Sequence, residues 1–183
     1  MTLAEAQRAN RRTYRGGLHG QLVSAALWGA SAALAQWGNH RLAMIGIVVG
    51  GCFIYPLTAL ALRLTGHDVR ANAANPLNPL AMQVAFTVPL GLPVVLTLAH
   101  FSPRMFYPAL LMLVGAHYLP FVFLYGTLAW LGLAGAMLAS GYVLGWVAPQ
   151  GFAFGGWLGA ALLVAYALTG WRLVIAEEKR AAA

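Results

Sequence analysis

Charged side chains are scarce in this sequence, and acidic ones are the scarcest. Only 8% of the 183 residues are charged, against roughly 25% in an ordinary soluble domain, and only 4 are Asp or Glu. Hydrophobic residues make up 61% of the chain. This composition excludes a typical water-soluble domain and indicates that most of the chain lies in a lipid bilayer.

Residues that bind metals or carry out catalysis are also few and scattered. Cys52 is the only cysteine, which excludes an internal disulfide and any metal site made of several thiolates. The 5 histidines match no HExxH pattern, and no GxSxG elbow is present. No carboxylate falls within an apolar segment, so the carboxylate relay of many coupled transporters is missing. We therefore predict no metal and no cofactor, and an enzyme is disfavoured.

Six apolar segments are long enough to cross a bilayer, which takes about 20 residues each. They cover residues 18–37, 42–64, 79–100, 104–125, 128–147 and 152–173. The sequence therefore predicts an all-α, polytopic bundle of six transmembrane helices over 18–173, between a basic tail at 1–17 and a second tail at 174–183. Both tails are expected to be solvated, although the capping-box spacing of Thr2 and Glu5 would begin a short helix along the headgroups.

The basic residues lie mostly on one side of these segments. Of the 11 Lys and Arg residues, all but Arg41 and Arg104 fall on the side that holds both termini. By the positive-inside rule both termini are cytoplasmic. The net charge of +7 is then better explained by contact with anionic lipid than by binding to nucleic acid.

Glycines and prolines indicate how the segments pack. Glycines recur along 128–147, which predicts close helix packing and offers faces for a homo-oligomer. Pro56 predicts a kink beside Tyr55, because proline removes a backbone donor. Pro89 and Pro93 predict a bent or broken helix.

The longest internal connection, residues 65–78, is expected to be a solvated surface loop. Its only acidic residue, Asp68, could orient His67 or pair with Arg70. Asn75 and Asn78 each precede a proline, a pattern typical of turns and helix starts.

His117 lies near the middle of the fourth segment, one turn before Pro120. An ionisable ring at this depth is costly without a partner. It is expected either to donate to a carbonyl, Gln or Thr of a neighbouring helix, or to serve a ligand, a proton or a cofactor. The candidate ligand or pathway residues are His117, Tyr118, Pro120, Gln83 and Tyr55.

A resemblance to a known family rests on a set of short motifs. These are Asn75-Pro76-Leu77, Ser102-Pro103, and Gly115-Ala116-His117-Tyr118 followed by Pro120 and Tyr125. Over residues 75–126 the chain resembles an uncharacterised bacterial multi-pass membrane family, domain of unknown function 7010. The resemblance implies a protein of the bacterial inner (plasma) membrane and brings no reaction or ligand with it.

Three functions remain open. The first is a small solute or ion carrier or channel whose pathway passes beside His117, where the prolines of the second to fourth segments can free backbone carbonyls. The second is a non-transporting accessory or lipid-interacting membrane protein. The third is an intramembrane enzyme or haem protein that uses His117, and the only histidine pair to check for haem ligation is His40 with His100.

Overall fold

A computed structural model of the chain describes residues 1–67 and 72–182. Every regular element within this described part is a helix, as the composition predicts. The elements are α1 (Leu3–Thr13), η1 (Arg15–Gly17), α2 (Leu18–Trp37), α3 (His40–Gly51), α4 (Ile54–Leu64), α5 (Asn78–Phe101), η3 (Pro103–Met105), α6 (Phe106–Tyr118), α7 (Phe121–Tyr125), α8 (Ala129–Tyr142), η4 (Val143–Val147) and α9 (Phe154–Ala182).

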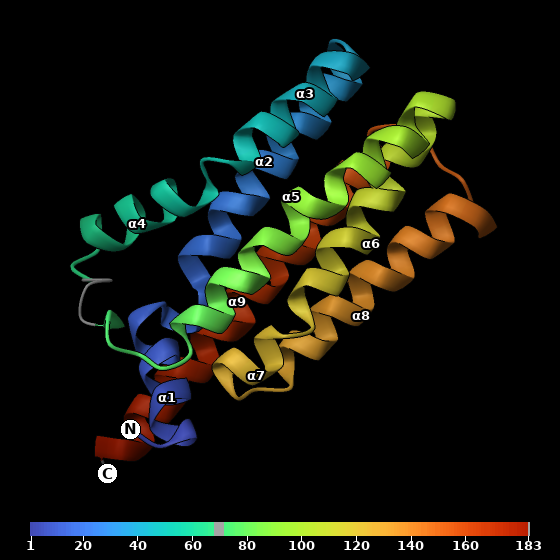
Figure 1. The fold of residues 1–183 in the computed structure, drawn as a ribbon. Helices are drawn as coiled ribbons and strands as arrows, with labels where there is room; N and C mark the ends of the chain where they lie inside the picture. The colour runs from blue at the N-terminus through green and yellow to red at the C-terminus, as the bar shows by residue number, and fades with distance from the viewer. Residues whose placement is uncertain (68–71, 183) are drawn as a thin grey trace.

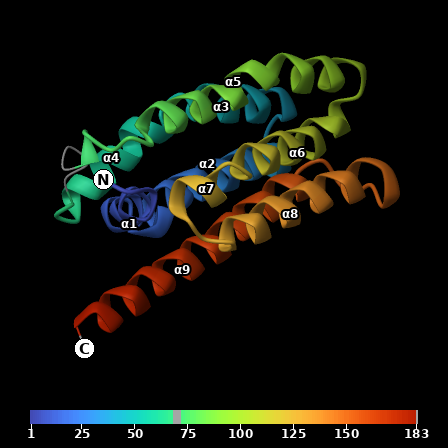
Figure 2. The ribbon, with the colours of Figure 1, turned by 60° about the horizontal axis from the view of Figure 1, so that its bottom comes forward.

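The long helices run side by side as one bundle (Figure 1). The main contacts pair α2 with α9, α6 with α8, α2 with α3, and α5 with α6. Large side chains fill the interior, and Trp28, Tyr107, Trp130 and Leu163 are each at most 3% exposed. Both termini lie at the same end of the bundle, where α1 crosses it (Figures 1 and 2).

Several of these helices could cross a membrane. By length and apolar composition, 4 segments of the described chain qualify: Asn78–Phe101, Pro103–Tyr125, Ala129–Val147 and Phe154–Arg180. The bent pair α3 and α4 makes a fifth if it is a single span. The helix α2 has 20 residues but is less apolar, because it carries polar side chains such as His19, Gln21 and Gln36. Length and apolar character thus support four or five spans, where the sequence predicted six.

The second predicted segment breaks into α3 and α4, with a bend of 61°. The break lies at Cys52 and Phe53, one turn before Pro56. Proline has no N–H to donate to the carbonyl four residues earlier, so it interrupts a continuous helix. It is tolerated in the first turn of a helix, and Pro56 lies in the first turn of α4. The predicted kink is therefore confirmed, a few residues earlier than Tyr55. Beyond the break, α4 leaves the bundle (Figure 1).

The other proline predictions have mixed outcomes. Despite Pro89 and Pro93, α5 is one continuous helix of 24 residues, so of the predicted bend or break the break does not occur. By contrast, the helix containing His117 does break: α6 ends at Tyr118, and Pro120 precedes the short helix α7.

The glycines of α8 differ in what they contact. A Cβ atom on Gly141 would lie 2.5 Å from the carbonyl oxygen of Pro108 in α6, so this glycine allows the two backbones to meet. A Cβ atom on Gly132 or Gly135 would meet nothing within 4 Å. Close packing through the predicted glycine face is therefore confirmed at Gly141, and not at the other two positions.

We predict that Gly141→Ala destabilises the bundle by about 1–3 kcal/mol, because the added methyl group forces α6 and α8 apart. The matched control is Gly132→Ala on the same helix, which gains helix propensity and meets no neighbour, so it should be neutral or stabilising by up to about 1 kcal/mol. Denaturant unfolding in detergent micelles, followed by tryptophan fluorescence, compares the two variants. Equal effects would contradict the packing described here.

Candidate functional site

The end of the bundle that holds both termini is built around the short helix α7. This helix ends at Gly126, whose φ of 65° is left-handed and suits glycine. The last carbonyls of any helix lack a donor within the helix. Here Gly126 N donates to Val122 O at 2.8 Å, which leaves the next three carbonyls to other partners.

The helix α1 supplies those partners. It lies across the end of the bundle and directs donor side chains at the carbonyl end of α7. Gln7 Nε2 donates to Phe123 O at 2.7 Å, and Asn10 Nδ2 donates to Leu124 O at 2.9 Å. The Arg11 guanidinium donates to Tyr125 O. The N-terminal segment therefore acts as a side-chain cap on a helix more than 100 residues away.

Asn10 also binds the segment before α5. Its Oδ1 atom accepts from Asn72 Nδ2 at 2.7 Å and from Asn75 Nδ2 at 3.1 Å. Asn75 Nδ2 additionally donates to Ala6 O at 2.9 Å. All three asparagines are at most 5% exposed. The expectation of a solvated loop is thus wrong for Asn72 and Asn75, and the possible contacts of Asp68 lie outside the described residues.

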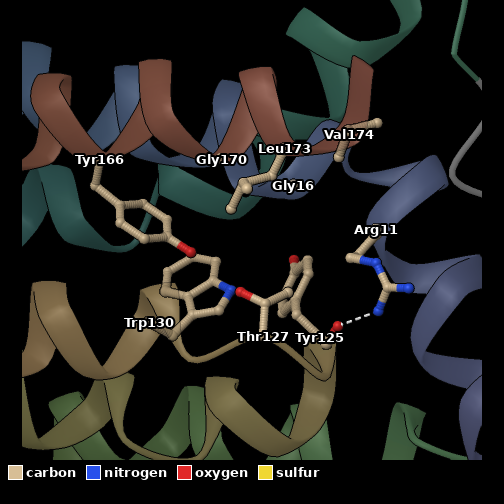
Figure 3. Close-up of a pocket in the computed structure, with 9 residues that line it drawn as sticks. All are labelled: Arg11, Gly16, Tyr125, Thr127, Trp130, Tyr166, Gly170, Leu173 and Val174. Atoms are coloured by element: carbon tan, nitrogen blue, oxygen red, sulfur yellow. Dashed lines mark hydrogen bonds between the residues drawn. The ribbon is translucent and has the colours of Figure 1, made fainter. Parts of the chain in front are cut away.

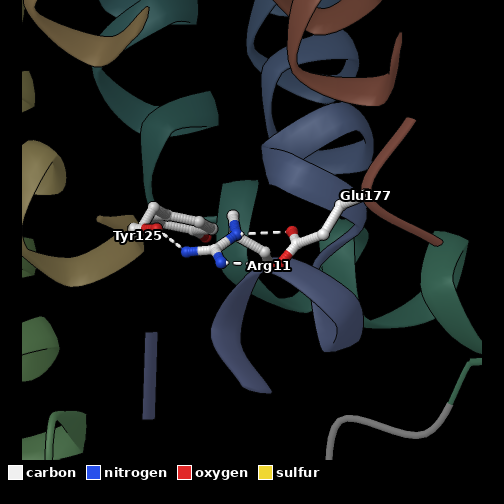
Figure 4. Close-up of polar contacts among 3 residues, drawn as sticks. All are labelled: Arg11, Tyr125 and Glu177. Carbon is white, nitrogen blue, oxygen red and sulfur yellow. Dashed lines mark hydrogen bonds and ion pairs between the residues drawn. The ribbon is translucent and has the colours of Figure 1, made fainter. Parts of the chain in front are cut away.

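Two ion pairs join the N-terminal segment to the end of α9. The guanidinium of Arg11 binds Glu177 in a bidentate manner, at 2.8 Å for each nitrogen, while it also reaches the carbonyl of Tyr125 (Figure 4). Arg15 pairs with Glu178 at 2.6 Å. A bidentate, partly buried pair is stronger than a typical surface salt bridge. The prediction of solvated tails is therefore wrong at these residues.

The turn between α1 and α2 has left-handed backbone at three successive residues, Arg15, Gly16 and Gly17, with φ of 50°, 65° and 92°. At Gly16 a Cβ atom would lie 2.5 Å from the carbonyl oxygen of Gly170, so only glycine lets this turn cross α9. Just before the turn, burial raises the pKa of the Tyr14 phenol, which keeps it neutral at physiological pH. The turn positions α1 over the bundle.

A small pocket lies beneath α1 and η1, between α9 and the α7–α8 connection (Figure 3). It has room for no more than about one water molecule, and its accessible lining is mostly apolar. The lining includes Arg11, Tyr125, Thr127, Trp130 and Tyr166. The Thr127 hydroxyl is buried and has no hydrogen-bond partner among the described residues. Such an orphaned polar atom is unusual, and a single water molecule beside it would satisfy it.

The structure places His117 between α6 and α5. Its Nδ1 atom lies 2.9 Å from Val84 O and 2.8 Å from the Thr87 hydroxyl. A carbonyl can only accept, so Nδ1 carries the proton in this arrangement. Thr87 donates to the same carbonyl at 2.7 Å. The ring thus donates to a backbone carbonyl of a neighbouring helix, which is the first of the two arrangements expected for His117. This hydrogen bond links α6 to α5.

Of the other predicted site residues, Tyr118 lies beside His117, with ring centroids 5.4 Å apart, but Gln83 and Tyr55 do not bond to it in the described part of the chain. Tyr118 is buried and donates to Gln21 Oε1 at 3.1 Å, which joins α6 to α2. Tyr55 is 72% exposed at the start of α4, and Gln83 is exposed on α5. Neither forms a hydrogen bond with His117 in the described part of the chain.

Comparison with known proteins now places this arrangement in a family. A family model described as "Family of unknown function (DUF7010)" matches residues 3–176. The chain belongs to this family. The resemblance over residues 75–126 is therefore confirmed, and membership of the family extends through α1, the asparagine cluster and the pocket. Neither the curated proteins nor the solved structures compared with the chain include a match.

Sequence reasoning did not identify the residues of this site. One signal was available: the capping box is confirmed, with Thr2 N donating to Glu5 Oε2 at 2.7 Å and Glu5 N donating to Thr2 Oγ1 at 3.3 Å. These hydrogen bonds lower the pKa of the Glu5 carboxyl. They indicate that α1 forms, but not that Asn10 and Arg11 face the bundle.

We predict that Asn10→Ala destabilises the protein by about 2–4 kcal/mol, because the buried Leu124 carbonyl loses its donor and the Asn72 amide loses its acceptor, although Asn75 still donates to Ala6 O. Arg12→Ala, an exposed change on the same helix, should stay within about 0.5 kcal/mol of wild type. Denaturant unfolding in micelles measures both. If Asn10→Ala were as mild as the control, α1 would not be docked as described.

Proposed function

We propose that the chain is an integral protein of a bacterial inner membrane, with six spans formed by α2, the α3–α4 pair, α5, α6–α7, α8 and α9. The exposed apolar side chains of α5 support this, since Phe86, Leu90, Val94 and Phe101 are 56–81% exposed and lipid would cover them. The helix α2 packs along α9, so it would cross the membrane together with that span. Both termini lie at one end, and the excess of basic residues on that side favours the cytoplasm.

Within the membrane, we propose that the protein is a small-solute carrier or channel whose cytoplasmic end is closed in this structure. The observation that carries this proposal is the pocket beneath α1, with its orphaned Thr127 hydroxyl and its roof held by the Arg11–Glu177 pair. Broken helices are a recurring feature of transporter sites, and α6–α7 supplies one beside this pocket. This proposal locates the site at α7 and α9 rather than beside His117.

Opening would require α1 to leave the carbonyl end of α7. Arg15, Gly16 and Gly17 provide the hinge, since this turn is the sole connection between α1 and α2. Closure depends on hydrogen bonds and ion pairs rather than on deep apolar burial, and side-chain donors can exchange one partner for another. An open state a few kcal/mol above the closed one would be populated at about 0.1–10%.

The second candidate, a lipid-interacting or accessory protein, is favoured by α4. Its side chains Leu57, Leu60 and Leu64 are 48–78% exposed along one face, and α4 contacts mainly α2. Such a helix suits the boundary between headgroups and acyl chains. The open space beside Gly132 and Gly135 also leaves a face of α8 for lipid or a second copy. For an enzyme or haem protein built on His117, the bond from Nδ1 to Val84 O leaves Nε2 as the nitrogen that could act.

Solute flux into reconstituted vesicles tests the carrier proposal. Light scattering follows the recovery of vesicle volume in urea, glycerol or potassium formate, with valinomycin present to balance charge. Wild-type vesicles should take up at least one of these solutes faster than empty vesicles. Asn10→Ala should raise that rate several-fold, because loosening α1 increases the open population.

Gly141→Ala is the matched control, because it weakens the bundle at a distance from α1 and would reveal leakage caused by general instability. Rates equal to those of empty vesicles, in both the wild type and Asn10→Ala, would remove the carrier proposal and leave the accessory function in its place.

A further inference from the structure

The helix α4 runs across the beginning of α2 rather than along it. A Cβ atom on Gly20 would lie 3.7 Å from the Thr58 side chain, and His19 Nε2 lies 3.0 Å from the Thr65 hydroxyl. Thr58 and Thr65 are seven residues apart, about 10 Å of helix, yet they meet neighbouring residues in the first turn of α2. This part of α4 therefore stays at the level where α2 begins, to one side of the bundle (Figure 1).

That level is the cytoplasmic surface of the bilayer on the topology proposed above. The helix α3 has 12 residues and is about 18 Å long, shorter than the roughly 30 Å of hydrocarbon. The 11 residues of α4 are bent 61° from α3, so they add only about 8 Å along the direction of α3. The second span is therefore completed obliquely by α4, which reaches the headgroup layer closer to the plane of the bilayer than to its normal.

One side of α4 is an exposed apolar stripe. Its members recur every three or four residues and are 48–78% exposed: Phe53, Leu57, Leu60 and Leu64. On the other side of the helix, Leu62 is fully buried and Thr65 contacts α2. We call the exposed set the α4 stripe. A row of apolar side chains beside a bundle is covered by acyl chains when the helix lies at the boundary of the bilayer.

The flank beside the α4 stripe is polar and basic. Tyr55 and Arg63 are eight residues apart, so they lie on the same side of the helix, and both are exposed. Arg63 forms no ion pair within the part of the chain that the structure describes. A phenol with an apolar body suits the headgroup layer, and a guanidinium binds phosphate through paired hydrogen bonds.

We infer that α4 is an interfacial helix that places its stripe among the acyl chains of the inner leaflet and binds the headgroup of an anionic phospholipid through Arg63. The inference names the partner for the lipid-interacting function, and it rests on the membrane location proposed above. Charge selects lipid over a second copy of this chain, since a copy would bring another net charge of +7, whereas the inner leaflet has a negative surface.

Spin labels on the full chain in nanodiscs of phosphatidylcholine and phosphatidylglycerol test the position of α4. With Cys52 replaced by Ser, one label is attached at Leu64→Cys in the stripe, at Ala59→Cys between Tyr55 and Arg63, or at Leu90→Cys, which is 76% exposed on α5. Oxygen concentrates in hydrocarbon, and a nickel chelate stays in water. The labels in the stripe and on α5 should relax mainly with oxygen, and the label at Ala59→Cys mainly with nickel.

A bimane label at Leu64→Cys measures which lipid lies beside α4, through quenching by nitroxide-labelled phosphatidylglycerol or nitroxide-labelled phosphatidylcholine. Quenching should favour phosphatidylglycerol about fivefold, the factor expected for one basic residue at an anionic surface. Arg63→Gln should abolish this preference. Arg41→Gln is the matched control, because it removes the same charge at the start of α3, and it should leave the preference unchanged.

The inference is overturned if the stripe label relaxes with nickel while the α5 label relaxes with oxygen, because the protein would then be embedded with α4 in water. Nickel relaxation of both labels would instead remove the proposed membrane location itself. A lipid preference that survives Arg63→Gln, or spin–spin broadening that shows a second copy on the stripe, would also overturn it. An immersed stripe with a lipid preference in vesicles without solute flux would support the inference and remove only the carrier.

Discussion

The buried amide of Asn10 is the contact on which the rest of this end of the molecule depends. Its nitrogen donates to the carbonyl end of α7, and its oxygen accepts from two asparagines that precede α5. It therefore joins three segments that lie far apart in the chain. Buried amides are costly unless fully bonded, so the three segments can be brought together only in an arrangement that satisfies them all.

The need for this contact arises from the backbone. Pro120 ends the regular helix after Tyr118, and the short α7 that follows leaves three carbonyls without internal donors. In water these groups would be solvated, but where they are buried they need protein partners. The helix α1 meets that need with Gln7, Asn10 and Arg11, and the left-handed turn at Gly16 lets it do so. Closing the pocket is a consequence of the same docking.

The sequence predicted the parts of the fold that depend on local chemistry. The helical class, the start of α1 at its capping box, and the break near Pro56 follow from composition, side-chain capping and the missing proline N–H. The predictions of a helix break and of close glycine packing failed where the outcome depends on the surrounding structure rather than on the local sequence. Pro89 and Pro93 are accommodated in an unbroken α5, and Gly132 and Gly135 meet no partner although Gly141 does.

The site was harder to predict for the same reason. His117 attracts notice because an imidazole is rare in an apolar helix, yet its proton is used to join α6 to α5. Arg11 and Glu177 look like ordinary charges of two tails, because nothing local reveals that α1 folds back onto α9. Thr127 and Trp130 carry no pattern at all. The Thr127 hydroxyl stands out only because it remains unbonded once the bundle is assembled.

Hydrogen–deuterium exchange of the purified protein is the most direct test of the docking of α1. If α1 is held by α7, α9 and the asparagine cluster, the amides of residues 7–13 and of Gly126 should exchange about as slowly as those within α9. A free helix of only 11 residues gives almost no protection in water. Complete exchange of residues 7–13 at the earliest time point, while α9 stays protected, would contradict the account.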